Sequence, residues 1–78
     1  MIVSAAIQID GVIYSLPKPA RHHDIMFRIP EGHVVQPDEQ GFLTSEGTFA
    51  HRRLAHRIAF KSGQVATMDG QLFSEDLW

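Results

Sequence analysis

The pattern of hydrophobic and polar residues at the start of the chain predicts a β-hairpin. Residues 2–9 are β-branched and small, and residues 12–16 form a second apolar run. Asp10-Gly11 lies between the two runs, and both positions of a tight two-residue turn need a positive φ, which this dipeptide adopts readily. We therefore expect two antiparallel strands joined at Asp10-Gly11.

Apolar residues at helical spacing predict a short helix over residues 20–29. Pro19 suits the first position of a helix, and Pro30 ends the segment. One face of this helix carries His22, Ile25, Met26 and Ile29. Residues 31–40 have no clear period and are expected to form a loop.

A second hairpin and the main helix are expected in the middle of the chain. Residues 41–44 and 48–50 flank Ser45-Glu46-Gly47, a typical tight turn between short strands. The main amphipathic helix follows over residues 51–62, and Gly63 suits its C-terminal cap. Its expected buried stripe consists of Leu54, Ala55, Ile58, Ala59 and Ser62.

The last residues are expected to form small turns. Residues 65–73 contain Met68-Asp69-Gly70 and are compatible with a third small hairpin. Ser74 is a good N-cap for a last helical turn over Glu75-Asp76. Together these elements predict an α+β fold, with residues 1–78 in a single domain.

Length and composition limit how such a domain is stabilised. A chain of 78 residues has room for one small core, and a domain of this size buries only about 60% of its unfolded surface. The absence of cysteine excludes disulfides, thiolate metal sites and thiol catalysis. We therefore expect a homo-oligomer, with Leu72-Phe73 and Leu77-Trp78 as candidate interface residues.

The charge distribution favours a local anion site over general nucleic-acid binding. The net charge is −2, yet four of the seven basic residues lie close together, at Arg52, Arg53, Arg57 and Lys61. No apolar stretch approaches the roughly 20 residues that span a bilayer. The first residues lack the positive charge of a signal peptide. We therefore expect a cytoplasmic protein with no membrane partner.

The polar run Arg21-His22-His23-Asp24 is the first candidate for chemistry. His22 shares its helix face with apolar residues and is interpreted as a histidine at the edge of the core. His23 points away from that face and is freer to contact a ligand. Asp24 lies one helical turn from Arg21 and Arg28 and is expected to bridge both. No metal site is expected, because adjacent histidines diverge on a helix and no His-x-x-x-His pair exists.

The start of the main helix is the second candidate. Arg52 and Arg53 lie where the helix dipole is already positive, an arrangement that a nearby anion stabilises. Glu75, Asp76 and a ligand phosphate are the candidate anions. Arg52 falls at the border of the buried stripe, where its planar guanidinium suits bidentate binding of carboxylate or phosphate.

The outer face of the main helix has two interpretations. Arg53, Arg57 and Lys61 suit a solvated basic surface. Phe60 lies on the same polar face, with Arg53, His56 and Arg57 around it, and fits either a stacking surface for a base or a contact between copies of the chain.

Catalysis by the two adjacent histidines stays open. His22 or His23 could act as general acid or base while Arg21 and Arg52 hold a phosphodiester. The same residues would equally hold a phosphorylated ligand without reaction, and their spacing does not separate the two. The sequence contains no nucleophile elbow and no phosphate-binding glycine loop.

Several short motifs follow one another along the chain: Arg21-His22-His23, Gly41-Phe42-Leu43-Thr44, Gly47-Thr48-Phe49 with Arg52 and Ala55, Gly63-Gln64, and Ser74-Glu75-Asp76-Leu77. In these motifs the chain resembles a group of short, mostly uncharacterised proteins that phages and prophages encode. The resemblance covers the chain from Arg21 onward. It implies a phage protein in the host cell, where small phage proteins often block a defence complex or bind or degrade a nucleotide immune signal.

We therefore expect the chain to sequester a phosphorylated, nucleotide-derived immune signal in an Arg/His pocket, without a cofactor. The candidate ligand-binding residues are Arg21, His22, His23, Phe42, Thr44, Arg52, Phe60, Ser74, Glu75 and Asp76. Arg21, Arg52 and His23 are the expected phosphate contacts.

Four of the other candidates are assigned to the rest of the ligand. Phe42 or Phe60 would stack the base, and Glu75 or Asp76 would accept hydrogen bonds from ribose or base edges. Two alternatives remain. One is a metal-independent phosphodiesterase that uses one of the adjacent histidines, and the other is an inhibitor that docks on a host defence complex through residues 52–61 or Trp78.

Overall fold

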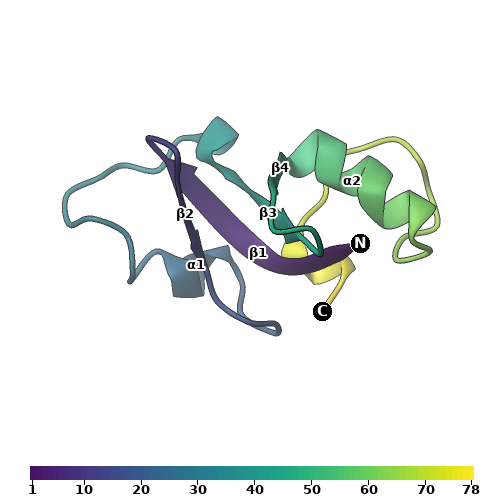
Figure 1. Ribbon diagram of the computed structural model, residues 1–78, viewed down its shortest axis with the longest axis horizontal. Coiled ribbons are helices and arrows are strands. Elements are labelled where there is room, and N and C mark those ends of the chain that lie inside the picture. Colours follow the sequence, from purple (N-terminus) through teal and green to yellow (C-terminus); the bar gives the residue numbers. More distant parts are fainter.

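A four-stranded antiparallel sheet forms the centre of the computed structural model, which describes residues 1–78 (Figure 1). The strands are β1 (Ile2–Ile9), β2 (Val12–Ser15), β3 (Gln40–Thr44) and β4 (Phe49–His51), in the spatial order β2-β1-β3-β4. The helices are α1 (His22–Ile25) and α2 (Arg52–Lys61), with 3₁₀ turns at Pro37–Glu39 and Ser74–Asp76. The α+β fold expected from the sequence is confirmed.

Both expected hairpins are present. Asp10 and Gly11 have φ angles of 49° and 80°, so the first turn has the two positive φ angles that the Asp-Gly dipeptide favours. The second turn joins β3 to β4 and uses Gly47 at a φ of 82°. Thr44 closes this turn, because its Oγ1 lies 2.7 Å from Thr48 Oγ1 and accepts from the Thr48 amide at 3.2 Å.

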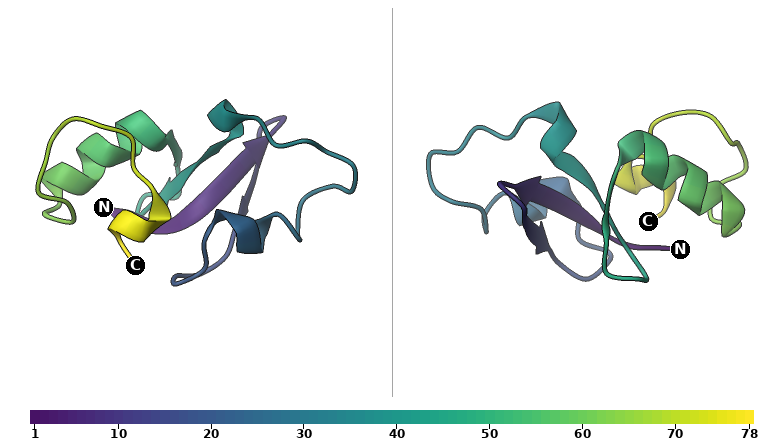
Figure 2. Two further views of the ribbon diagram at one scale, coloured as in Figure 1. Left: turned by 180° about the vertical axis from the view of Figure 1, so that it is seen from behind. Right: turned by 45° about the horizontal axis from the view of Figure 1, so that its top comes forward.

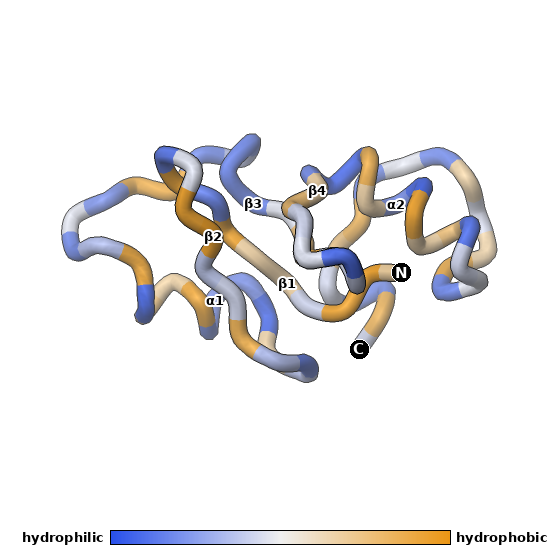
Figure 3. The backbone as a smooth tube through the Cα atoms, viewed as in Figure 1, coloured by the Kyte–Doolittle hydropathy of each residue, from blue (hydrophilic) through white to orange (hydrophobic).

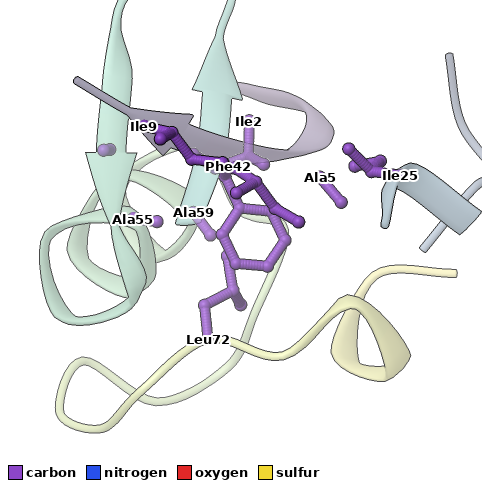
Figure 4. Packing of buried hydrophobic residues seen from close by; sticks show 10 residues of the cluster. Ile2, Ala5, Ile9, Ile25, Phe42, Ala55, Ala59 and Leu72 are labelled. Carbon is purple, nitrogen blue, oxygen red and sulfur yellow. The ribbon is translucent and has the colours of Figure 1, made fainter. Parts of the chain in front are cut away.

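The core joins both helices to the sheet around Phe42. Figure 4 shows Phe42 of β3 at the centre of the cluster, with its ring directed toward Leu72. Ile25 comes from α1, whereas Ala55 and Ala59 come from α2. Four of the other nine members are alanines, and Phe42 is the largest of the fully buried side chains.

The first helix is shorter than expected, because α1 ends at Ile25 and residues 26–29 form turns. Of its apolar residues, Ile25 is fully buried, whereas Met26 is 40% and Phe27 is 85% exposed. Helical spacing alone does not hold a short helix in water without a packed face. Pro30 adds to this effect, since it disfavours helical backbone at Ile29.

Asp24 also differs from its expected role. Its side chain does not form ion pairs with Arg21 or Arg28; instead Oδ2 accepts from the Arg21 backbone amide at 2.8 Å. Oδ1 lies 3.2 Å from His23 Nε2. An acid in the first turn finds free amides close by, and these replace the more distant guanidinium groups.

The main helix α2 is one residue shorter at each end than expected, and its buried stripe is displaced. Ala55 and Ala59 are buried as expected, whereas Leu54 and Ser62 are exposed. His56 is buried in their place, and its Nε2 donates to Thr67 O at 2.7 Å. The stripe shifts because Thr67 and Gly70 of the following segment lie against His56, which the helical pattern alone does not indicate. Figure 2 shows this segment passing beside α2.

The cap at Gly63 is confirmed. Gly63 has a φ of 75°, its amide donates to Phe60 O, and the Gln64 amide donates to Ala59 O. These two bonds form a Schellman motif. Gln64 then binds the backbone of β1, because its side chain contacts both Ile2 N and Ile2 O at 2.9 Å.

The third hairpin is not formed, and residues 65–73 contain no strand. Gly70 instead lies over the His56 ring, where a Cβ would approach the ring at 3.5 Å. The last helical turn is present at Ser74–Asp76, but Ser74 is buried within it. Asp76 provides the cap, since its Oδ2 accepts from the Phe73 amide at 2.9 Å. Neither helix has the length and apolar character needed to cross a membrane.

Candidate functional site

The polar residues singled out in the sequence gather around one cavity, which we call the C-terminal cleft. Its volume is about 260 Å³, and it is lined by Arg21, His22, His23, Met26, Arg52, Phe73, Ser74 and Glu75. The start of α1, the first residue of α2 and the last 3₁₀ turn each provide part of the lining. Segments far apart in the sequence thus form one site.

Arg52 holds the C-terminal segment against the sheet. Its Nη1 donates to Leu72 O at 2.8 Å, and its Nη2 donates to Gln40 Oε1 at 2.9 Å. Its guanidinium carbon lies 4.6 Å from the centre of the Phe73 ring. Burial lowers the pKa of Arg52 from its ordinary value, and the Glu75 carboxylate acts in the opposite direction. An arginine with these surroundings stays charged at neutral pH.

Arg21 fastens the other end of this segment. Its Nη2 donates to the backbone carbonyl of Trp78, and its Nη1 lies 3.9 Å from Glu75 Oε1. The Trp78 indole in turn donates to Ala20 O at 3.0 Å. The two arginines therefore hold the C-terminal segment in place and also give the wall of the cleft a positive charge.

His22 is held in one tautomer at the base of the cleft. Its Nε2 donates to Gly41 O at 2.7 Å, and its ring meets the edge or face of Phe42 at 5.2 Å and 84°. Burial lowers the pKa of His22, the Gly41 hydrogen bond opposes that shift, and Arg52 adds to the lowering. His22 is therefore neutral at neutral pH, with Nδ1 as its free acceptor.

His23 has a different environment, at the rim of the cleft. Its side chain is 73% exposed, and only Asp24 is paired with it. The two histidines therefore separate as expected, since His22 belongs to the edge of the core and His23 is accessible.

A family model described as "Phage T4 y16D protein" matches residues 1–78, the whole chain. The chain belongs to this phage protein family. The resemblance to small phage-encoded proteins is thereby confirmed at the level of family. No curated protein and no solved structure matches the chain.

Four of the expected ligand residues lie outside the C-terminal cleft of this y16D family member: Phe42, Thr44, Phe60 and Asp76. Phe42 is fully buried, so its ring is not accessible to a base. Thr44 and Asp76 serve the hairpin turn and the last helical turn described above. Phe60 lies on the outer face of α2, in a separate recess with Arg57 and Lys61.

Phe73 is the phenyl side chain in the cleft. From the sequence it was expected only at an interface between copies of the chain. It is 46% exposed and packs against Arg52. No local pattern indicates this contact, because Arg52 and Phe73 meet only after the C-terminal segment folds back over the sheet. The structure contains no group of three or more histidine or carboxylate side chains that could hold a metal ion.

Proposed function

We propose that this chain captures a phosphorylated, nucleotide-derived small molecule in the C-terminal cleft. One observation carries the proposal: Arg21, Arg52 and His23 converge on a cavity whose only lining carboxylate is Glu75. Guanidinium groups partly removed from water bind phosphate strongly, because charge-assisted hydrogen bonds gain strength there. Each guanidinium has five N–H donors, so the donors used within the protein leave others for a ligand.

The dimensions of the cleft favour a particular mode of binding. A cavity of about 260 Å³ is at the small end for ligand sites. It suits a phosphate or pyrophosphate group with part of a ribose, while the base lies at the mouth. The Phe73 ring, with Arg52 on one side, offers the base a stacking surface there.

Membership of a phage family supports a role for such capture in the infected cell. Sequestration of a nucleotide-derived immune signal would lower its free concentration without any reaction. The surroundings of His22 favour capture over turnover, since its side chain is buried and its Nε2 is already bonded to Gly41. The His23–Asp24 pair supports a second candidate, a slow metal-independent phosphodiesterase, because a carboxylate 3.2 Å from an exposed histidine can orient its ring for proton transfer.

Incubation with ADP-ribose and with cyclic dinucleotides, followed by heat denaturation, distinguishes capture from cleavage. Capture predicts that intact ligand is released, whereas cleavage predicts new products that disappear in His23→Gln. Arg52→Lys is expected to weaken binding about tenfold or more by calorimetry, because the flexible ammonium replaces a planar, multidentate donor. Arg28→Lys is the matched control, since Arg28 is exposed and does not line the cleft. Equal affinities of the two variants would exclude the cleft as the site.

Glu75 provides a second test of the same site. Its carboxylate lies 3.9 Å from Arg21 Nη1 and also acts on Arg52 and His22. A ligand phosphate must displace it or be repelled by it. Glu75→Gln is therefore expected to raise the affinity for pyrophosphate about three- to tenfold, measured by calorimetry at constant ionic strength. Glu46→Gln, in the exposed β3–β4 turn, should leave the affinity unchanged. A weaker Glu75→Gln complex with pyrophosphate would instead show that Glu75 positions Arg21 for the phosphate.

A further inference from the structure

The outward side of α2 carries a row of cations that the C-terminal cleft does not use. Arg53, Arg57 and Lys61 follow one another at intervals of four residues, and all three are exposed. We call this row the α2 basic face. None of its members lines the C-terminal cleft, and none belongs to the three ion pairs of the chain.

This arrangement is unfavourable for the isolated chain. Like charges four residues apart destabilise a helix by about 0.2–0.5 kcal/mol per pair. Arg53 adds a positive charge to the positive end of the helix dipole, and α2 contains no acidic residue that would compensate. Asp69 lies near Arg57 and Lys61 but forms no ion pair with either, so an external acidic group is the natural counterpart of this face.

Exposed apolar side chains accompany the cations of this face. Hydrophilic and hydrophobic residues alternate along the backbone of α2 (Figure 3). Leu54, Phe60 and Met68 are 44%, 37% and 55% exposed. Two shallow recesses contain them. One of about 300 Å³ is lined by Arg57, Phe60, Lys61, Met68 and Asp69, and one of about 290 Å³ by His51, Arg53, Leu54 and Arg57. Arg57 lines both recesses, so they form one continuous surface.

We propose that the α2 basic face docks an acidic, amphipathic helix of a partner protein. Carboxylates four residues apart on such a helix repeat every ~6 Å, which matches the spacing of the three cations along α2. The partner's apolar residues would enter the recesses beside Arg57. A nucleic acid fits less well, because the row extends only ~12 Å and the chain as a whole has a net charge of −2, which repels a long polyanion.

A synthetic helical peptide tests this surface directly. The probe has glutamates four residues apart beside leucines, and a matched peptide has glutamine in place of glutamate. With the isotope-labelled chain, NMR titration is expected to shift the signals of residues 51–61 and Met68 with the glutamate peptide alone. Arg57→Glu should weaken binding at least tenfold, and rising salt should weaken binding to the unaltered chain. Arg28→Glu, which makes the same change at another exposed arginine, should bind like the unaltered chain.

Several outcomes would overturn the proposal. The glutamate peptide could fail to bind, shift the residues of the C-terminal cleft, or bind Arg57→Glu and Arg28→Glu equally. Tighter binding of a single-stranded oligothymidylate to α2 would assign the surface to nucleic acid instead. Arg57→Gln removes the charge without reversing it and should show an intermediate loss of affinity for the glutamate peptide. Such a graded loss distinguishes an effect of charge from misfolding. Because Arg57 is exposed, both variants are expected to retain the native amide spectrum elsewhere.

Discussion

Replacement of Phe42 by alanine is expected to lower the free energy of unfolding by about 3–5 kcal/mol, which is most of the stability of so small a domain. The side chain is fully buried, lies at the centre of the core cluster and contacts the His22 ring. The neighbouring residues Ala55 and Ala59 are too small to fill the resulting cavity. Urea denaturation measures the loss as a lower transition midpoint with an unchanged slope.

Phe27 is the matched control, because 85% of it is exposed. Phe27→Ala should change the free energy of unfolding by no more than about 0.5 kcal/mol. Phe42→Leu keeps a large apolar side chain in the core but removes the aromatic ring that was expected, from the sequence, to stack on the base of a ligand. It should retain the fold and bind pyrophosphate and ADP-ribose like the unaltered chain. Loss of ADP-ribose binding alone in a folded Phe42→Leu protein would restore Phe42 as a base contact.

The elements that were predictable from the sequence are specified by residues within the element itself. Asp10-Gly11 and Gly47 specify their turns through positive φ, and Gly63 specifies the end of α2 in the same way. The failures have a common cause. The length of α1 and the absence of a third hairpin depend on which surfaces are covered by distant segments, and helical or strand periodicity contains no such information.

The candidate site shows the same division. Arg21 and Arg52 stand out in the sequence because of their position and charge, and the structure places both at the C-terminal cleft. Their partners could not be predicted, since Trp78 O and Leu72 O are backbone atoms presented by tertiary folding. Whether copies of the chain associate stays a prediction that the apparent mass in solution tests.

The contacts in the structure explain several of the motifs that the chain shares with small phage proteins. Gly63-Gln64 caps α2 and binds Ile2, while Asp76 caps the last turn. Thus several motif residues are explained by the fold alone. His23 and Glu75 are different, because both side chains are mostly exposed at the cleft and neither supports the core. They are the positions at which a functional requirement is easiest to separate from a structural one.

Gly41 is the position where the fold and the site depend on the same atoms. A Cβ at this residue would lie 2.4 Å from Ala50 O and 2.6 Å from Phe49 Cζ, both in β4. The carbonyl of Gly41 accepts the hydrogen bond that orients His22. Gly41→Ala is therefore expected to lower the free energy of unfolding by about 3 kcal/mol, since β4 must move away from β3. In a domain of this size, that loss lowers the melting temperature by more than about 10 °C.

Two companion variants show why Gly41→Ala has this effect. Gly32→Ala lies in open space at a φ of 84°, so it measures only the cost of a side chain in left-handed backbone, about 1–2 kcal/mol. Phe49→Ala combined with Gly41→Ala removes the ring contact but leaves the clash with Ala50 O, so it should not recover the stability of Phe49→Ala alone. Full recovery would mean that the ring, and not the backbone of β4, requires glycine. If β3 shifts as well to relieve the clash, the Gly41 carbonyl shifts with it, and binding in the C-terminal cleft should weaken even where the protein stays folded.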